Sequence, residues 1–478
     1  MTFGLEQHII DKIISVFEAN ARVDKAYVFG SRAKGNYRPD SDIDIAIKGI
    51  DITLDDILKM SVAFEDKGIK NKIDLIDYTT IKEPALLEHI DRVGIELYSR
   101  WKEVKLGKLI NVINGFAFKS TDFLDTEEPN SLPIIKIKNV ANGDVNIEGV
   151  HFHFLSDGLK KYIVQNNDIL ISLTGNHPEL ETQVVGLVSK YKLVSKALLN
   201  QRVAKLVSKN SNELSSDYLY YFLKNKDTHL LLASQSSGSA NQANISKTNI
   251  EDIPFSKPPI QEQTTIASIL SSLDDKIDLL QRQNKTLEQL AETLFRQWFV
   301  EEAEESWEVG KLDDIAVFSN GKSRPNEVEN GEIPIYGGNG ILGYTDQSNY
   351  EGLSVIIGRV GAYCGSLYIE NKPIWLSDNA LIARGQKEDY TFYLFYLLKS
   401  MELNSMAEGS SHPLLTQTLL KSIDICVSPS QKVLGFNKQV SEFWTKIYAN
   451  QTQIRTLTHT RDTLLPKLMS GEVRVVIN

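Results

Sequence analysis

Two long segments with the same spacing of apolar residues constrain the fold of this 478-residue chain most strongly. Residues that alternate steps of four and three run from Ile266 to Trp298 and again from Phe436 to Leu468. This spacing predicts two long helices with one apolar seam each, and an Asn on each seam favours a defined register. One such helix alone could equally lie on an ordinary core, but two at equivalent places favour mutual packing as a coiled coil. The seam residues expected to meet are Leu273, Ile277, Leu280, Asn284, Leu287, Val440, Ile447, Asn450, Ile454 and Leu457.

Each helix closes one half of an internal repeat. The segments WKEVKLGKLI at 101–110 and WEVGKLDDIA at 307–316 open the two halves. Each half then has a Pro-containing strand, an apolar run, a helix rich in Tyr, Phe and Leu, a polar loop and a second Pro-containing strand. The chain therefore alternates lobe, helix, lobe and helix, and an antiparallel helix pair would place the lobes at opposite ends.

The composition is that of a globular protein, with 42% hydrophobic and 24% charged residues. No apolar run is long enough to span a bilayer, and the N-terminus lacks the pattern of a signal peptide, so we expect a cytoplasmic protein. The two cysteines, Cys364 and Cys426, argue against a disulfide framework or a Cys-based zinc site. The net charge of −10 argues weakly against binding a polyanion, but residues 101–260 carry 18 Lys and Arg against 16 Asp and Glu.

Residues 101–478 resemble the specificity subunit of type I restriction–modification systems. The resemblance rests on the two Trp-x-x-x-x-Leu openings, on QEQTTIASILSSLDDKIDLLQRQNKTLEQLAETLFRQWF at 261–299, and on RDTLLPKLMSGEVRV at 461–475. It implies two target-recognition domains that each read half of a bipartite double-stranded DNA sequence, without a cofactor. It also implies helices that dock two methyltransferase subunits and, through them, restriction–translocation subunits. The chain lacks the Asn/Asp-Pro-Pro-Tyr/Phe tetrapeptide of adenine methyltransferases and a Gly-x4-Gly-Lys-Ser/Thr loop, so partners would supply those chemistries.

Side chains that read bases are expected on the loops of both lobes, because Arg, Lys, Asn and Gln suit the edges of bases. The candidates in the first lobe are Lys119, Lys136, Lys138, Asn139, Thr174, Asn176, Arg202, Asn241 and Gln242. Those in the second lobe are Lys322, Arg324, Asn339, Arg359, Arg384 and His412. For each of them, ordinary solvated surface is the alternative. The segment HFH at 151–153 places two imidazoles on one strand face, and we interpret it as structural because no further His/Cys pair supports a metal site.

Residues 1–98 form a separate unit of alternating helices and strands. Helices are predicted over 6–19, 53–66 and 83–97, and strands over 25–30, 42–48 and 71–77. Residues two apart in a strand share a face, so Asp42 and Asp44 converge while Ile43 and Ile45 face the core. Converging carboxylates of this kind bind Mg²⁺ well when phosphate and water complete its shell.

This order of elements, with Gly-Ser before the two acids and a third acid in KIDLID, resembles the minimal nucleotidyltransferase family of the polymerase-β-like superfamily. The resemblance implies that Asp42, Asp44 and Asp74 are catalytic and bind Mg²⁺, with ATP or another nucleoside triphosphate as substrate. It implies that Gly30 and Ser31 grip the phosphates in a turn. Arg32 and Lys34 are further nucleotide contacts or solvated residues. Members of this family often work with a helical partner as antitoxins, which leaves a toxin-like partner open.

The predicted fold class is a multidomain α+β chain, with an α/β nucleotidyltransferase domain and two α/β recognition domains alternating with two antiparallel coiled-coil helices. The predicted segments are a nucleotidyltransferase-like domain at 1–98, recognition domains at 99–260 and 301–430, helices at 261–300 and 431–470, and a tail at 471–478. The favoured function is DNA specificity with a fused nucleotidyltransferase. One alternative is AMP transfer to a protein or RNA from a targeting scaffold, and another is an assembly protein with a decayed enzyme domain.

Overall fold

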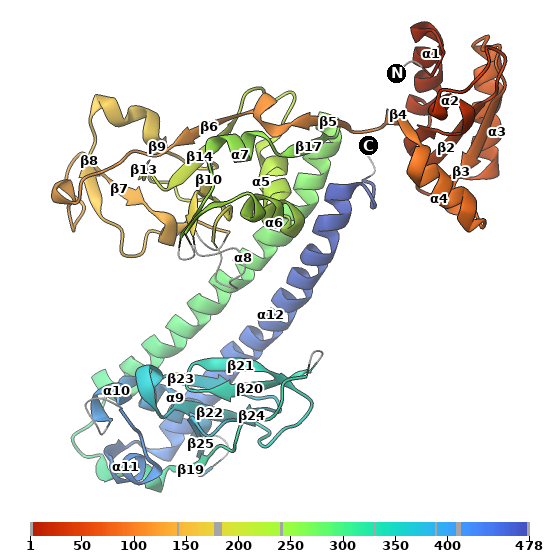
Figure 1. Ribbon diagram of the computed structural model, residues 1–478. Coiled ribbons are helices and arrows are strands. Elements are labelled where there is room, and N and C mark those ends of the chain that lie inside the picture. The colour runs from red at the N-terminus through yellow and green to blue at the C-terminus, as the bar shows by residue number, and fades with distance from the viewer. Residues whose placement is uncertain are drawn as a thin grey trace. The chain divides into compact units, whose positions relative to one another are not determined.

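The computed structural model in Figure 1 describes residues 3–140, 143–175, 184–239, 242–328, 331–387, 390–407 and 413–475. It divides into two compact units, residues 1–273 with 460–478 and residues 274–459. Both contain helices and sheets, as the predicted fold class requires. This division cuts through both long helices, so the boundaries of the six predicted segments stay a prediction. Within the described ranges, no helix is long and apolar enough to cross a membrane.

The N-terminal part of the first unit is a mixed sheet of four strands with the order β3-β2-β1-β4. Its elements are α1 (Gln7–Glu18), β1 (Val23–Val28), α2 (Gly30–Lys34), β2 (Ile43–Gly49), α3 (Leu54–Asp66), β3 (Ile73–Asp77), α4 (Pro84–Val93) and β4 (Ile95–Ser99). Ile43, Ile45 and Ile47 are fully buried and pack with Phe17 and Phe64, as the alternation in β2 predicts. The predicted helix at 83–97 is too long, because Gly94 takes an extended conformation and the chain continues as β4.

The first lobe contains three sheets and a strand pair. The pair is β5 (Lys102–Lys105) with β17 (Pro254–Lys257), and the sheet β12-β10-β14-β6 is built from β6 (Ile110–Asn114), β10 (Ile169–Ser172), β12 (Val188–Lys190) and β14 (Val203–Ser208). The sheet β8-β7-β13-β9 contains β7 (Ser131–Ile135), β8 (Phe152–Phe154), β9 (Ile163–Val164) and β13 (Ala197–Leu199). A smaller sheet, β11-β16-β15, contains β11 (Thr174–Gly175), β15 (Ser237–Ser239) and β16 (Gln242–Asn244). The helices are α5 (Ser216–Lys224), α6 (Lys226–Ser234) and α7 (Lys247–Glu251).

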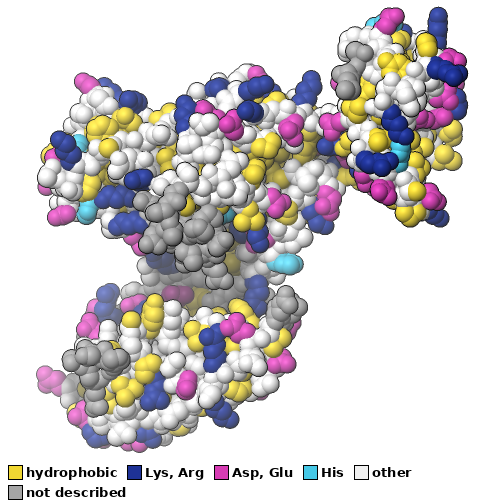
Figure 2. All heavy atoms as spheres, in the orientation of Figure 1, with side chains coloured by type: hydrophobic (Ala, Val, Ile, Leu, Met, Phe, Trp, Pro, Cys, Tyr) yellow, Lys and Arg dark blue, Asp and Glu magenta, His cyan; other side chains and the backbone are white. Residues whose placement is uncertain are grey.

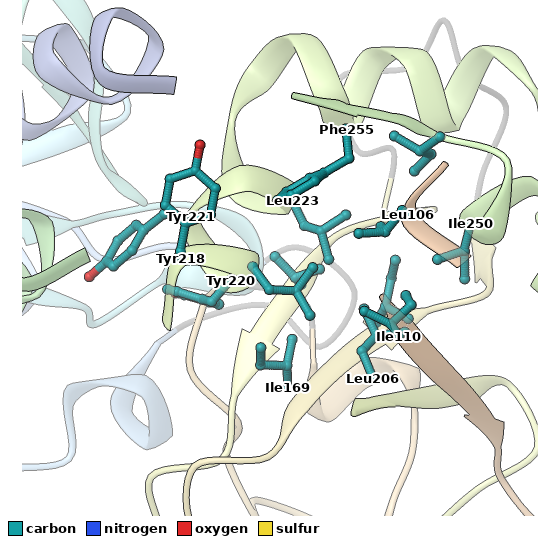
Figure 3. Close-up of a cluster of buried hydrophobic side chains, with 14 of the residues drawn as sticks. Leu106, Ile110, Ile169, Leu206, Tyr218, Tyr220, Tyr221, Leu223, Ile250 and Phe255 are labelled. Atoms are coloured by element: carbon teal, nitrogen blue, oxygen red, sulfur yellow. The ribbon is translucent and has the colours of Figure 1, made fainter. Parts of the chain in front are cut away.

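The core of the first lobe joins these layers to one end of each long helix. Figure 3 shows Ile110 and Leu206 from the sheet in one cluster of buried side chains with Tyr218 from α5 and Phe255 from β17. Apolar residues of both long helices belong to the same cluster. The first lobe and these helix ends therefore share one core.

The second lobe lies in the second unit. Its strand pair is β18 (Glu308–Lys311) with β26 (Asp424–Val427), and its sheet β19-β25-β22-β23 contains β19 (Ala316–Asn320), β22 (Ser354–Gly358), β23 (Leu367–Glu370) and β25 (Ala380–Gly385). The sheet β21-β20-β24 contains β20 (Ile333–Gly337), β21 (Gly340–Thr345) and β24 (Trp375–Leu376). The helices are α9 (Thr391–Ser400), α10 (Leu403–Met406) and α11 (Gln417–Ser422).

The two lobes repeat the same topology, which confirms the internal repeat. The strand order β6-β14-β10-β12 of the first lobe matches β19-β25-β22-β23 of the second. Each lobe also contains one parallel strand pair, β7 with β13 in the first lobe and β20 with β24 in the second. Two glycines occupy equivalent places, since a Cβ on Gly115 would lie 2.1 Å from the carbonyl oxygen of Asn200, and one on Gly321 would lie 1.9 Å from that of Ser377. Only glycine permits these close backbone approaches.

The Trp residues that open the repeats contact the beginnings of the long helices α8 (Ile260–Arg296) and α12 (Ser430–Ser470). In the first unit, the Nε1 of Trp101 donates to the buried carboxylate of Glu262 at 3.1 Å, and Arg100 pairs with the same carboxylate at 2.6 Å. In the second unit, the ammonium of Lys432 lies 5.3 Å from the centre of the Trp307 ring. A cation on α12 therefore takes the place that an anion has on α8.

The antiparallel pairing of α8 and α12 is confirmed in each unit. In the first unit, Ile266 and Leu270 share a core with Leu465 and Leu468. In the second, Ala291 packs with Phe436 and Val440, and Asn284 bonds to Asn450. Of the predicted seam residues, Ile277, Leu280, Asn284, Val440, Ile447 and Asn450 are buried, and Leu273, Leu287, Ile454 and Leu457 are half-buried. A π-helical turn (Gln297–Glu301) extends α8.

Candidate functional sites

Three carboxylates meet at one end of the parallel strands β2 and β3. Asp44 and Asp74 are register partners across this pair, and Asp42 directly precedes β2. The Nζ of Lys72 lies 2.6 Å from Oδ1 of Asp74 and 4.0 Å from Oδ2 of Asp42. Partial burial, then the charges of Asp74 and Asp42, raise the pKa of Asp44. Asp42 and Asp74 therefore share one cation, and the negative charges of both act on Asp44.

Gly30 lies directly against this cluster. Its φ of +71° suits glycine, and a Cβ at this position would lie 2.1 Å from Oδ2 of Asp44. Gly30 and Ser31 begin the short helix α2, directly after the extended Phe29. Ser31 is half-buried and Lys34 is exposed. A close approach of backbone to the Asp44 carboxylate is thus built into the site.

Arg32 does not have the exposed position that a phosphate contact requires. Its side chain is 2% exposed, and its guanidinium donates to the backbone carbonyls of Phe3, Pro39, Ser41 and Asp42. All three nitrogens are used in this way. We therefore replace the predicted nucleotide contact with a positioning role, because these bonds hold the segment that carries Asp42.

The carboxylates fit a divalent cation in chemical type. Among the described residues, no group of three or more His, Cys, Asp or Glu side chains is arranged so that it could hold a metal ion. The ammonium of Lys72 is instead the cation between Asp42 and Asp74. Mg²⁺ characteristically takes one or two carboxylates and leaves its other positions to phosphate oxygens and water, so a complete protein shell is not required.

The predicted base-reading residues of the first lobe fall into four groups, namely exposed, half-buried, buried and outside the described residues. Lys119, Lys138 and Arg202 are exposed, and the Nζ of Lys138 donates to the carbonyl of Gly149 at 2.6 Å. Lys136 is half-buried with its ammonium 4.2 Å from the Phe123 ring centre, and burial, then Lys138, lowers its pKa. Asn176 and Asn241 and the side chain of Gln242 lie outside the described residues.

Two of the first-lobe candidates are buried. Asn139 is 1% exposed; its Oδ1 accepts from the Lys136 amide and its Nδ2 donates to Asn146 and Glu148. This side chain closes a loop and does not face a base, which corrects the prediction. Thr174 is also buried, and its hydroxyl donates to Asn244 at 2.7 Å. Its hydroxyl also accepts from Nη1 of Arg202 at 3.4 Å, so this buried side chain can act on a ligand only through its neighbours.

In the second lobe, Lys322, Arg324 and Asn339 are exposed. Arg324 pairs with Glu327 and donates to the carbonyl of Leu342 at 2.9 Å. Arg384 is half-buried and donates to Ser354 and Glu351, and its predicted contact with DNA stays a prediction. The Nε of the half-buried Arg359 has no partner in the described part of the chain.

His412, the remaining candidate, lies outside the described residues. Figure 2 shows Lys and Arg side chains mixed with Asp and Glu on the face in view. The lobes therefore carry no large field of one sign on this face.

The HFH segment belongs to an aromatic surface that joins distant parts of the first lobe. The ring centre of His153 lies 4.9 Å from that of Phe118, which in turn lies 5.0 Å from that of Phe116. His151 packs on Phe123 at 5.0 Å. This packing agrees with a structural role for both imidazoles.

Comparison with known proteins identifies the greater part of the chain. Residues 98–289 and 304–460 match the family described as type I restriction modification DNA specificity domain. The chain belongs to this family. Residues 11–103 match the family described as polymerase beta, nucleotidyltransferase, so the specificity region follows a nucleotidyltransferase domain.

Relatives of this specificity family support the assignment along the chain. The MjaIX specificity subunit of Methanocaldococcus jannaschii is 24% identical over 79% of this chain and 97% of its own. The EcoAI specificity subunit of Escherichia coli is 32% identical over 46% of this chain and 36% of its own. The crystal structure of a type I S subunit from M. genitalium covers 77% of this chain and 96% of its own, with 20% identity and a TM-score of 0.53. This last likeness shows the shared fold.

Proposed function

We propose that this specificity-family chain reads a two-part DNA sequence, one part with each lobe. The observation that carries the proposal is that the two lobes have the same strand order but different side chains at equivalent positions. Phe116 follows the framework glycine in the first lobe and Lys322 follows it in the second. Because bases are distinguished by the side chains that face them, equal frameworks with unequal edges suit two different half-sites.

The long helices are proposed to dock two methyltransferase subunits and, through them, restriction–translocation subunits. The relatives named above are specificity subunits of type I restriction enzymes, which supports such an assembly. On α8, Leu279 and Leu290 are 41% and 48% exposed, although other apolar residues of the helix, such as Ile277 and Leu280, are buried. Exposed apolar residues on an otherwise paired helix suit a protein partner.

Whole-genome methylation sequencing tests this proposal. The chain, co-expressed with its methyltransferase in a host without other adenine methylation, should direct methylation to one split sequence. The methyltransferase alone is the control and should leave the genome unmethylated. An active methyltransferase that yields no split motif with the chain present would contradict the proposal. A failure to co-purify with it as well would favour a purely structural assembly role.

For the N-terminal domain we propose Mg²⁺-dependent transfer of a nucleotide from ATP or another triphosphate to a protein or RNA. Asp42, Asp44 and Asp74 would hold the metal, which when bound neutralises the phosphates and stabilises the in-line displacement. Gly30 and Ser31 would lie along the triphosphate beside Asp44. Asp74, on the neighbouring strand, would help to activate the attacking hydroxyl. Support comes from the family match, from the pairing of Asp42 and Asp74 with one cation, and from the register partnership of Asp44 with Asp74.

Labelled ATP and Mg²⁺ test this second activity. Wild-type protein should transfer label to an acceptor in a lysate of its own host, and the Asp42→Asn/Asp44→Asn double variant should not. Asp66→Asn is the matched control, because it removes an exposed carboxylate at the end of α3. Equal labelling by wild type and the double variant would rule out this site. A labelled helical protein would identify a toxin-like acceptor, and labelled RNA would identify the other class.

A further inference from the structure

Equivalent backbone positions can be assigned between the lobes from their hydrogen bonds. In the first lobe, the amide of Leu173 donates to the carbonyl of Arg202 at 3.0 Å, and the amide of Ile245 donates to the carbonyl of Leu173 at 3.0 Å. In the second lobe, Arg359 donates to Asn379 at 3.1 Å and Leu415 donates to Arg359 at 2.9 Å. The backbone pattern is the same in both.

This correspondence pairs positions that carry different side chains. Arg202 is equivalent to Asn379. Thr174 follows Leu173 as Val360 follows Arg359, and Asn244 precedes Ile245 as Leu414 precedes Leu415. Thr174 and Asn244 are therefore equivalent to Val360 and Leu414. The bridges themselves agree, because Thr174 pairs with Asn244 and Val360 pairs with Leu414, both antiparallel. Only the first lobe therefore has polar side chains at all three positions.

These three polar side chains form a connected group. The Oδ1 of Asn244 accepts from the hydroxyl of Thr174 at 2.7 Å and from Nη1 of Arg202 at 3.2 Å. Thr174 is 5% exposed, whereas Arg202 is exposed. A buried hydroxyl thus fixes the amide of Asn244, and that amide fixes one nitrogen of an exposed guanidinium.

In the described part of the chain, several N–H donors of this group have no hydrogen-bond acceptor. Within the described residues, no acceptor pairs with Nε or Nη2 of Arg202 or with Nδ2 of Asn244. The site therefore presents several N–H donors together. A guanine offers two adjacent acceptors, O6 and N7, on its major-groove edge, and a bidentate Arg is its commonest protein contact. An oriented guanidinium loses little further freedom when it binds.

We infer that Arg202 reads a guanine in the half-site of the first lobe, positioned by Asn244 and Thr174. This inference rests on the proposed DNA-reading function and specifies one base contact within it. The second lobe, with Asn379, Val360 and Leu414 at the equivalent positions, reads its own half-site without this group. A phosphate contact is the competing role for Arg202, and it would not depend on the base.

The experiment compares methylation motifs of the full chain co-expressed with its methyltransferase. Arg202→Ala should relax one guanine position in one half-site, lowering the preference for guanine over other bases roughly 10- to 100-fold. The other half-site should stay unchanged and reports that the variant is folded. Lys102→Ala is the matched control; it removes one exposed cation from β5, outside the three-stranded sheet, and should leave both half-sites unchanged.

Positioning by Asn244 has its own test. Asn244→Ala should relax the same guanine position as Arg202→Ala, and Asn244→Asp, which keeps an acceptor for both donors, should restore the preference. Thr174→Val tests the buried end of the group. We expect this variant to fold, because Val360 occupies the equivalent position in the second lobe.

Three outcomes overturn the inference in distinguishable ways. A wild-type chain without a split motif removes the proposed function and the inference together. A wild-type split motif that Arg202→Ala leaves intact removes the inference alone. A variant that lowers methylation at all sites equally, without relaxing any base, assigns Arg202 to a phosphate.

Discussion

The amide nitrogen of Asn450 on α12 donates to Oδ1 of Asn284 on α8 at 2.8 Å, between side chains that are 1% and 9% exposed. The two seam amides therefore satisfy each other inside an otherwise apolar contact. A shift of either helix along the other would leave both amides buried without a partner, so this bond selects one register.

Asn450→Leu should lower the free energy of unfolding by about 1–3 kcal/mol, because Asn284 would stay buried without its partner. Asn284→Leu/Asn450→Leu should recover most of this loss, since two apolar residues replace both partners. Denaturant unfolding followed by circular dichroism measures both. Lys285→Ala, at an exposed position of α8, is the control. Additive losses in the double variant would show that the amides act independently.

Asp44→Asn should raise the melting temperature at neutral pH while abolishing nucleotide transfer. The raised pKa of Asp44 means that its ionised form is disfavoured in the folded state, by burial and by Asp74 and Asp42. Its favourable contribution to stability is present at acid pH and is lost as pH rises through the folded-state pKa. The advantage of Asp44→Asn over wild type should therefore shrink on acidification.

Mg²⁺ sharpens this prediction. Calorimetry with and without Mg²⁺ should show stabilisation of the wild type and little effect on Asp44→Asn. An equal effect of Mg²⁺ on both proteins would place the metal elsewhere.

Gly30→Ala should abolish nucleotide transfer and destabilise the N-terminal domain more than Gly35→Ala does. Both glycines have positive φ, at +71° and +78°, so both substitutions carry a similar backbone strain of about 1 kcal/mol. Only Gly30 faces Asp44, whereas an added Cβ on Gly35 meets nothing within 4 Å. Thermal unfolding and label transfer separate the two effects. Equal losses in both variants would show that strain alone matters.

Arg32→Lys should lower the free energy of unfolding by roughly 2–4 kcal/mol, the scale of losing charged hydrogen bonds in a buried site. An ammonium cannot reproduce the planar set of donors that contacts four carbonyl groups. Nucleotide transfer should fall because the segment that carries Asp42 loosens. Arg38→Lys, at an exposed position on that segment, is the control and should change neither quantity. A fully stable but inactive Arg32→Lys would instead restore the phosphate contact as its role.

The helix seams and the convergence of Asp42 and Asp44 could be predicted because both depend on local periodicity, whereas Asp74 was assigned by family resemblance. Asn284 and Asn450 stand on a seven-residue spacing that any long helix translates into one face. Asp42 and Asp44 alternate with the buried Ile43 and Ile45, so a strand places the two aspartates on one face and the two isoleucines on the other. Neither inference needs the position of a distant segment.

The roles of Arg32, Asn139 and Arg384 could not be predicted in this way. Each is a polar residue held by hydrogen bonds to other segments or to its own loop, and a sequence gives no sign of which partner it will meet. Asn244 was missed for the same reason, since its partners Thr174 and Arg202 lie 70 and 42 residues away. The matching Asn-Gly pairs before Phe116 and Lys322 were the available signal, because they mark equivalent places in the two halves.

The crowded glycines at 115 and 321 separate what each lobe must keep from what it can change. Backbone oxygens leave no room for a methyl group at either glycine, yet the very next residue is an exposed Phe in one lobe and an exposed Lys in the other. Substitutions can thus change the exposed side chains of such a protein without disturbing its backbone framework. New preferences for DNA sequence would arise by exchanging the exposed side chains next to these glycines, one lobe at a time, while the backbone beneath them stays the same.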